Sequence, residues 1–296
     1  TATGGRLAAG IGGGAGKYQA VGGNGDVKIS GGTIIATGGY EGAGIGGGYS
    51  GNGTVTINGG TVTEASGGDE GAGIGGGSSG NGTVTITDGD ITATGGLWGA
   101  GIGGGVRRLG NVSIEGNVTI KNAQGGAGAA GIGGGARAEP DTEDTRNKIS
   151  IKSTEAGSPT ITATGGGAYK DDYVSLPVGA AAIGSGSVYE TIGEVNAKSD
   201  IIIEGKVTIN ATGGGNVAIG DNDGEKVFNG LAGGTNIKRT DSNGKDVTQD
   251  GDVVAEPEPE PKPEPEEPEK PAQPTVTPTG AETAEAPSTG SVEVEH

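Results

Sequence analysis

The sequence predicts an all-β protein, a right-handed parallel β-helix (β-solenoid) of about six to seven coils, from three observations. A glycine–isoleucine phrase, GIGGG, occurs five times, and degenerate copies follow at 182–186 and 218–220. The central isoleucines of the five full copies are 34, 29, 28 and 30 residues apart. A second phrase, of the type GTVTI-NGG-TVT, stands between the copies. A fixed period of this length indicates stacked repeats, and it is too short for the four strands of a propeller blade.

One repeat, residues 40–68, contains three short segments that alternate apolar and polar residues. Ala43 and Ile45 would face inward in the first segment, Val55 and Ile57 in the second, and Val62 in the third. β-Branched residues dominate, and no segment is long enough for a helix. Coils of this kind pair in parallel, and the usual crossover chirality makes the helix right-handed.

A recurring asparagine marks one corner of the predicted coil. Asn24, Asn52 and Asn81 each precede the inward isoleucine of the second segment by five positions. We expect them to stack as a ladder, because Asn beside Gly favours turn conformations.

The composition fits a solenoid and excludes several other classes. Among 296 residues there are 70 glycines, 30% hydrophobic residues, 3% aromatics, and no cysteine or methionine. Such a chain cannot fill an ordinary globular core, but it can fill a thin column. No apolar run approaches the length that spans a membrane. The net charge of −18 disfavours nucleic acid, anionic membranes and pectin-like polyanions as partners.

Two domains are predicted. Residues 1–252 form the β-helix, with 226–252 as a C-terminal cap that Phe228 closes. Residues 253–296 form a disordered Pro/Glu-rich linker and tail, which hold ten of the 13 prolines. A stiff linker of this kind suits a secreted or cell-surface protein that joins other modules of the same chain. Because residues 1–5 already match the end of a coil, we expect the chain to be a piece of a longer protein.

The residue types present give little support for a catalytic or metal site. The only histidine is His296, so nucleophilic triads and zinc sites are excluded from the body, and we expect no enzyme activity. Paired carboxylates remain, either Asp171 and Asp172 or the group at 141–144, but a solvated acidic loop explains both better. Asp221 and Asp223 have the look of a short calcium loop, for which a polar turn is the preferred interpretation.

The binding hypothesis rests on the glycine phrase itself. If Ala43 and Ile45 face inward, Gly42, Gly44 and Gly46 face outward and form a floor without side chains along the axis. Aromatic and charged residues would border this floor, and a glycan chain could lie on it with about one sugar unit per coil. The alternative is that the glycines allow tight packing under a covering loop, for which the insertion at 167–199 is the candidate. The predicted ligand-binding residues are Tyr40, Glu41, Tyr49, Glu70, Trp98 and Arg107, together with Tyr169 and Tyr173 from this insertion.

Trp98 stands where the regular coils carry Glu41 and Glu70. We expect its ring at the edge of the floor, either stacked on a sugar or packed under the insertion. If the ring stacks on a sugar, replacing Trp98 with alanine should weaken glycan binding and barely change the melting temperature.

Repeats such as GAGIGGGYSGNGTVTINGG over residues 1–252, followed by the Pro/Glu linker, resemble the β-helical carbohydrate-binding modules appended to xylanases of gut bacteria. The resemblance implies binding of a neutral plant polysaccharide, xylan or a related β-glycan, without catalysis, in a secreted multimodular glycoside hydrolase. Two alternatives stay open: a bacterial surface adhesin or structural stalk, and a β-helix polysaccharide lyase or glycoside hydrolase.

Overall fold

The computed structural model describes residues 1–16, 22–137, 146–171, 174–176, 178–187, 198–220 and 227–249. By its contacts the chain divides into one unit of Thr1–Pro257 and a second of Glu258–His296. All the described residues fall in the first unit. The predicted tail, 253–296, lies outside them.

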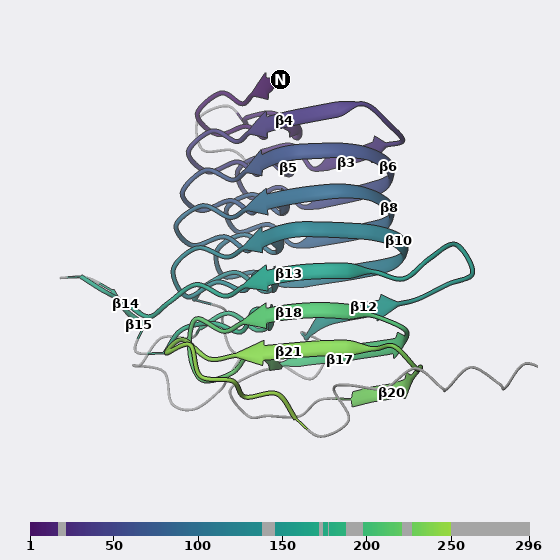
Figure 1. Cartoon of the computed structure of the whole chain (residues 1–296). Helices are drawn as coiled ribbons and strands as arrows, with labels where there is room; N and C mark the ends of the chain where they lie inside the picture. Colours follow the sequence, from purple (N-terminus) through teal and green to yellow (C-terminus); the bar gives the residue numbers. More distant parts are fainter. Residues whose placement is uncertain are drawn as a thin grey trace, which may run out of the picture. The chain divides into compact units, whose positions relative to one another are not determined.

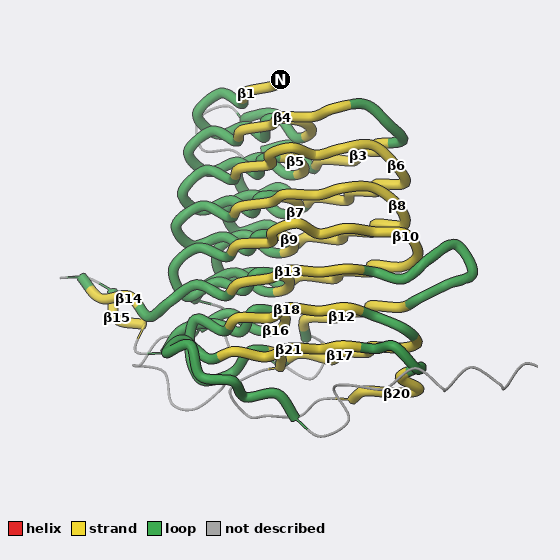
Figure 2. Tube along the Cα trace, in the orientation of Figure 1, coloured by secondary structure: helices red, strands yellow, loops and turns green. Residues whose placement is uncertain are grey.

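The described residues form strands and no helix, stacked as parallel coils (Figures 1 and 2). Each coil contributes a two-residue strand to a seven-stranded sheet and longer strands to a 12-stranded sheet that bends around the other two sides. This arrangement confirms the predicted parallel β-helix. The short strands are β2(Ile11–Gly12), β5(Ile45–Gly46), β7(Ile74–Gly75), β9(Ile102–Gly103), β11(Ile132–Gly133), β16(Ile183–Gly184) and β19(Ile219–Gly220).

The strands of the 12-stranded sheet follow the second phrase of each repeat, and all of them except the two-residue β1 are longer. They are β1(Ala2–Thr3), β3(Gly25–Ile29), β4(Thr33–Thr37), β6(Gly53–Ser66), β8(Gly82–Thr94), β10(Gly110–Gln124), β12(Asn147–Lys152), β13(Thr160–Thr164), β17(Ser199–Gly205), β18(Thr208–Thr212), β20(Val227–Leu231) and β21(Asn236–Thr240). In β6, β8 and β10 the two predicted segments are one strand, bent at register shifts. Glycines with positive φ, such as Gly59, Gly60 and Gly89, lie at these bends.

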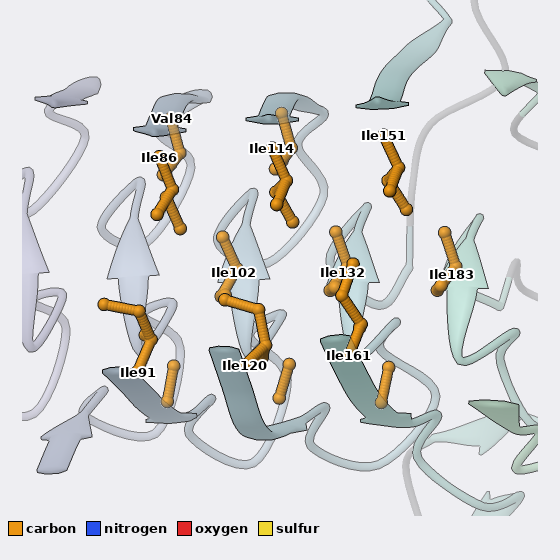
Figure 3. Close-up of a cluster of buried hydrophobic side chains, with 14 of the residues drawn as sticks. Val84, Ile86, Ile91, Ile102, Ile114, Ile120, Ile132, Ile151, Ile161 and Ile183 are labelled. Carbon is orange, nitrogen blue, oxygen red and sulfur yellow. The ribbon is translucent and has the colours of Figure 1, made fainter. Parts of the chain in front are cut away.

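The core is a set of columns, one residue per coil, that run along the axis (Figure 3). Ile45 pairs with Ile74, and Ile74 pairs with Ile102, which continues the column of the short strands. The second phrase adds a valine column, two isoleucine-rich columns and an alanine column. Ile74, Ile86 and Ile91 are fully buried. Because every coil places the same apolar residue at the same level, the core needs few large side chains.

The predicted asparagine ladder is present, and its bonds run from side chain to backbone. The side-chain oxygen of Asn24 accepts a hydrogen bond from the backbone N–H of Asn52 at 2.9 Å, and that of Asn52 accepts one from Asn81 at 2.8 Å. Asn81 accepts in the same way from Leu109 at 3.1 Å. Each amide thus satisfies a backbone donor of the next coil.

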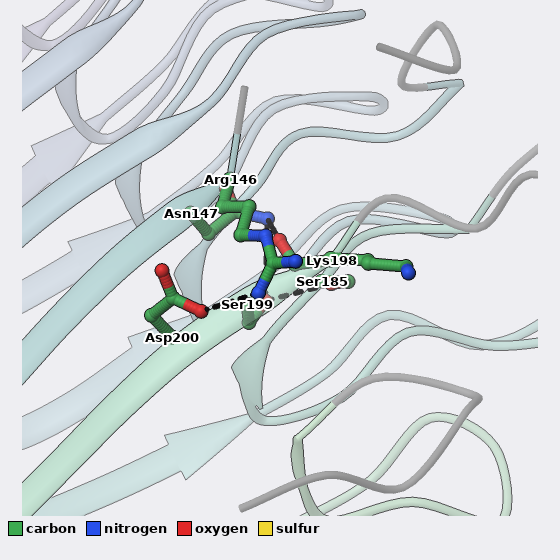
Figure 4. A network of polar contacts seen from close by, with 6 residues as sticks. All are labelled: Arg146, Asn147, Ser185, Lys198, Ser199 and Asp200. Carbon is green, nitrogen blue, oxygen red and sulfur yellow. Dashed lines mark hydrogen bonds and ion pairs between the residues drawn. The ribbon is translucent and has the colours of Figure 1, made fainter. Parts of the chain in front are cut away.

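The ladder ends at Leu109, and the next coil, which contains β11 and β12, has a buried polar network instead (Figure 4). Asn147 stands at the level where earlier coils have glycine, and its side-chain oxygen accepts from the backbone N–H of Gly110 at 3.0 Å. Its amide nitrogen donates to the carbonyl of Lys198 and the hydroxyl of Ser199. Ser199 and Ser185 share a hydrogen bond of 2.7 Å. The network joins the coils on either side of the inserted segments.

The region predicted to form the C-terminal cap contains two further strands. Residues 227–240 continue the solenoid, because β20 pairs with β17 and β21 pairs with β18. Phe228 stands in register with Ile203, and its side chain lies outside the described residues. Arg239 ends the alanine column and is 1% exposed. Val247 then donates to the carbonyl of Arg239 as the chain folds back over the last coil.

Candidate binding site

Two loops flank the short strand in every coil. The first loop precedes β5 and carries Tyr40 and Glu41, and the second follows it and carries Tyr49 and Ser50. Backbone hydrogen bonds join the second loop of one coil to the first loop of the preceding coil. The N–H of Ser78 donates to the carbonyl of Glu41 at 2.8 Å, and that of Val106 donates to Glu70 at 2.9 Å.

The structure contradicts the predicted open floor of glycines. Gly42, Gly44 and Gly46 are buried, as are the other residues from 42 to 48. A Cβ on Gly44 would lie 2.6 Å from the carbonyl oxygen of Gly73 and 2.8 Å from the backbone N of Ser66. The glycines are required because backbone packs on both sides of the strand. The alternative interpretation, that the glycines allow tight packing, is therefore correct. The segments packed against them belong to the regular coils and not to the insertion at 167–199.

A polar pocket of about 260 Å³ opens where the loops of several coils meet. Its lining includes four of the predicted binding residues: Glu41, Tyr49, Glu70 and Arg107. The remaining lining residues are Ser78, Ser79, Val106 and Arg137. Four of the residues predicted to border the floor therefore come together around a pocket.

Repeat position explains why these residues meet. Glu41 and Glu70 each lie four residues before the isoleucine of their phrase, and Tyr49, Ser78 and Val106 lie four residues after it. Equivalent positions of adjacent coils lie about 4.7–4.9 Å apart in a parallel sheet. Side chains from successive coils therefore line one wall along the axis.

Four residues at the next position share a left-handed backbone. Ser50, Ser79, Arg107 and Arg137 have φ of 53°, 56°, 64° and 62°. This conformation costs a residue other than glycine about 1–2 kcal/mol. Two coils nevertheless place an arginine there. A strained backbone at residues whose side chains line a pocket is typical of functional sites.

Charge dominates the chemistry of the pocket. The hydroxyl of Ser78, itself buried, donates to Glu70 Oε2 at 2.6 Å. Burial, and next the charge of Glu70, raise the pKa of Glu41, which Arg6 partly opposes. Burial, and next the charge of Arg107, lower the pKa of Arg137, an effect that Glu70 and Asp171 oppose. Acidic and basic groups thus interact within one small volume.

Trp98 is buried, with 7% of its surface exposed, so it offers no open face for stacking a sugar. It packs in a second hydrophobic cluster with Val106, Ala129 and residues of the inserted hairpin, Val174 and Leu176. The hairpin is β14(Tyr169–Lys170) paired antiparallel with β15(Ser175–Leu176). The structure therefore agrees with packing under the insertion and contradicts an exposed ring.

The indole also positions a pocket residue. The guanidinium carbon of Arg137 lies 5.3 Å from the centroid of the Trp98 ring, within the range of a cation–π interaction. Tyr169 packs edge-on against the same ring, with centroids 4.7 Å apart, and its hydroxyl donates to Asp171 Oδ2 at 3.1 Å. That hydrogen bond is the main reason why the pKa of Tyr169 is raised.

Replacing Trp98 with alanine should lower stability by about 3 kcal/mol, the lower end of the range for buried tryptophan. The reason is the lost contact between the solenoid and the hairpin β14–β15. Urea unfolding measures the loss, and limited proteolysis should show faster cleavage near 169–176. The control is Leu97→Ala, since Leu97 is 40% exposed. Equal stability of the two variants would contradict the buried placement.

The other predicted residues lie outside the pocket or outside the described residues. Tyr40 is 52% exposed and does not line it. Asp171 accepts hydrogen bonds from Val174 N and Tyr169, which gives it a structural role in the hairpin. Tyr173, Asp172, the acidic group at 141–144 and the possible calcium ligands Asp221 and Asp223 are not among the described residues. Within the described residues no cluster of three or more His, Cys, Asp or Glu is placed to hold a metal.

Comparison with known proteins supports the fold. Three stretches, residues 27–49, 55–78 and 84–106, match a family described as beta helix repeat. The chain is thus similar to β-helical repeat proteins, an architecture that fits polysaccharide binding, lyase activity or adhesion. Neither curated proteins nor solved structures gave a significant match. None of the described segments is a helix long and apolar enough to cross a membrane.

Proposed function

We propose that this protein is a non-catalytic module that binds a neutral plant polysaccharide, xylan or a related β-glycan, as part of a secreted multimodular enzyme. The observation that carries the proposal is the pocket formed by Glu41, Tyr49, Glu70 and Arg107. It offers hydrogen-bond acceptors, donors and an aromatic ring, the groups that recognise sugar hydroxyls and C–H faces. The Pro/Glu-rich stretch after residue 252 supports attachment to further modules.

Affinity electrophoresis on xylan, mixed-linkage glucan and pectin tests the proposal. We expect retardation on xylan. Glu70→Gln should weaken binding by about 1.5–3 kcal/mol, as expected for loss of hydrogen bonds to a charged group. Glu64→Gln is the matched control, since Glu64 is exposed on β6 and does not line the pocket. No retardation on any glycan would reject the proposal. Binding to mucin or cells alone would support an adhesin.

A second candidate function is cleavage of the glycan. The supporting observation is that Glu41 and Glu70 line the same pocket, where burial and the charge of Glu70 raise the pKa of Glu41, because a pair of carboxylates can serve as acid and base. Release of new reducing ends, abolished by Glu41→Gln, would favour an enzyme over a binding module. Binding without release of reducing ends would favour the module.

A further inference from the structure

The pocket lies on a column of repeat positions that runs along the axis, four residues before the isoleucine of each short strand. In the first five coils these positions are Leu7, Glu41, Glu70, Trp98 and Gly128. Of these residues, Glu41 and Glu70 line the pocket and the other three do not. The pocket therefore occupies this column at the second and third coils and ends where the column reaches Trp98.

The inserted hairpin β14–β15 closes the column on the C-terminal side. Trp98 is 7% exposed and packs in one hydrophobic cluster with Val174 and Leu176 of the hairpin. At the next position Gly128 is buried, and a Cβ added there would lie 2.5 Å from Cδ1 of Leu176, which is itself fully buried. Val106, which lines the pocket, belongs to the same cluster. A glycan chain that lies along the axis cannot pass this point.

The two ends of the pocket differ in exposure. The position four residues after each isoleucine carries Ala15 in the first coil and Ala136 in the fifth. Ala15 is exposed, whereas Ala136 is fully buried. Tyr49, Ser78 and Val106 stand between them in the same row and line the pocket. The row is thus accessible at its N-terminal end and closed at its C-terminal end.

The size of the pocket suits a single sugar ring. Its volume of about 260 Å³ equals that of roughly nine water molecules at about 30 Å³ each. One sugar ring with its hydroxyls fits this space, and a run of several rings does not. Tyr49 can stack on the C–H face of the ring. The Glu70 carboxylate, which the hydroxyl of Ser78 holds by a hydrogen bond of 2.6 Å, can accept sugar hydroxyls.

We propose that the pocket binds the terminal sugar of a glycan chain, with its ring on Tyr49, its free hydroxyls donating to Glu41 and Glu70, and the rest of the chain leaving over the first coil. The inference rests on the proposed function and names the part of the polysaccharide that this site selects. A terminal sugar is joined to its chain on one side only, so it fits a pocket that is closed at one end. A sugar within a chain is joined on both sides, and its next neighbour would meet the hairpin.

Isothermal titration with xylobiose, xylotetraose, xylohexaose and unbranched xylan fractions of known chain length tests the inference. We expect the three oligosaccharides to bind with affinities equal within about threefold, because sugars beyond the pocket add little contact. The number of protein molecules bound per xylan chain should stay constant as the chain becomes longer, because each added sugar extends the chain without adding an end.

Tyr49→Ala should weaken binding of every ligand by about tenfold or more, as for other aromatic residues at the centre of a binding site. Tyr40→Ala is the matched control, since Tyr40 belongs to the same coil, is 52% exposed and does not line the pocket. A smaller loss in Tyr49→Ala than in Tyr40→Ala would overturn the placement of the sugar.

The dependence on chain length separates the two proposals. Affinity that rises about tenfold or more from xylobiose to xylohexaose, with protein bound in proportion to the length of xylan, would overturn the inference while the proposed function stands. No binding of any of these ligands would overturn both.

Discussion

Replacing Gly75 with alanine should destabilise the protein by about 4 kcal/mol or more, within the range of the most damaging single substitutions. Gly75 ends β7 at φ +133°, and an added Cβ would overlap the carbonyl oxygen of Gly103. That same oxygen accepts the N–H of Gly76 at 2.9 Å, so it cannot move away without breaking the bond that joins the coils. Urea unfolding, followed by tryptophan fluorescence and circular dichroism, measures the change.

Two further glycine substitutions separate backbone strain from steric overlap. Gly32 has φ +87°, and a Cβ added there would meet no atom within 4 Å, so Gly32→Ala should cost about 1–2 kcal/mol from conformation alone. Gly31 has open space and no such φ, so Gly31→Ala should change stability by about 1 kcal/mol or less, in the stabilising direction. If Gly75→Ala were as stable as Gly32→Ala, the overlap with Gly103 would cost nothing, and the neighbouring coils would have to separate easily.

The fold could be predicted from the sequence because the same pattern of apolar residues recurs in each repeat. Each copy of the two phrases gives the same inward residues, such as Ile45, Val55 and Ile57, and all three are buried. The sequence pattern was less informative at the last coil, where residues 226–252 were assigned to a cap. There the GIGGG phrase is missing from 227–240, yet β20 and β21 continue the strand pairing. Backbone pairing tolerates a loss of the side-chain pattern that sequence reasoning depends on.

The candidate site was predicted in part. Glu41, Tyr49, Glu70 and Arg107 were found because large residues interrupt a glycine-rich stretch. Arg137 was missed, although it stands five residues after Ile132 just as Arg107 stands five after Ile102, and an alignment of the repeats by this offset would have found it.

For the glycines and for Trp98 the sequence left two interpretations open, and the open floor and the exposed indole are contradicted for one physical reason. Alternation along a strand shows which side a residue faces, and it does not show what lies there. The backbone that fills the space beside Gly44 belongs to Gly73 of the next coil and to Ser66 at the end of β6. Trp98 is covered by the hairpin β14–β15, which belongs to a single coil and has no repeat pattern to reveal its path.

The second large effect is expected from Ile74→Ala, at roughly 2–5 kcal/mol for a buried isoleucine. Ile74 is fully buried between Ile45 and Ile102 in the column of the short strands. We expect a value toward the upper end, because the glycine backbones on either side are already in contact and cannot collapse into the cavity. Ile202→Ala is the control, since Ile202 is 38% exposed on β17 and the same atoms are removed from the surface.

The part of the solenoid that loses stability in Ile74→Ala is as informative as the size of the loss. In a stack, each coil contacts only its neighbours, so stability is a sum of local and nearest-neighbour contributions. Hydrogen exchange of Ile74→Ala should therefore show the largest loss of amide protection in β5, β7 and β9, with smaller losses toward β1 and β21. An equal loss from end to end would mean that the solenoid unfolds as one cooperative unit. The cost of Ile74→Ala would then be shared by every coil, and the pocket between the second and fifth coils would open along with the core.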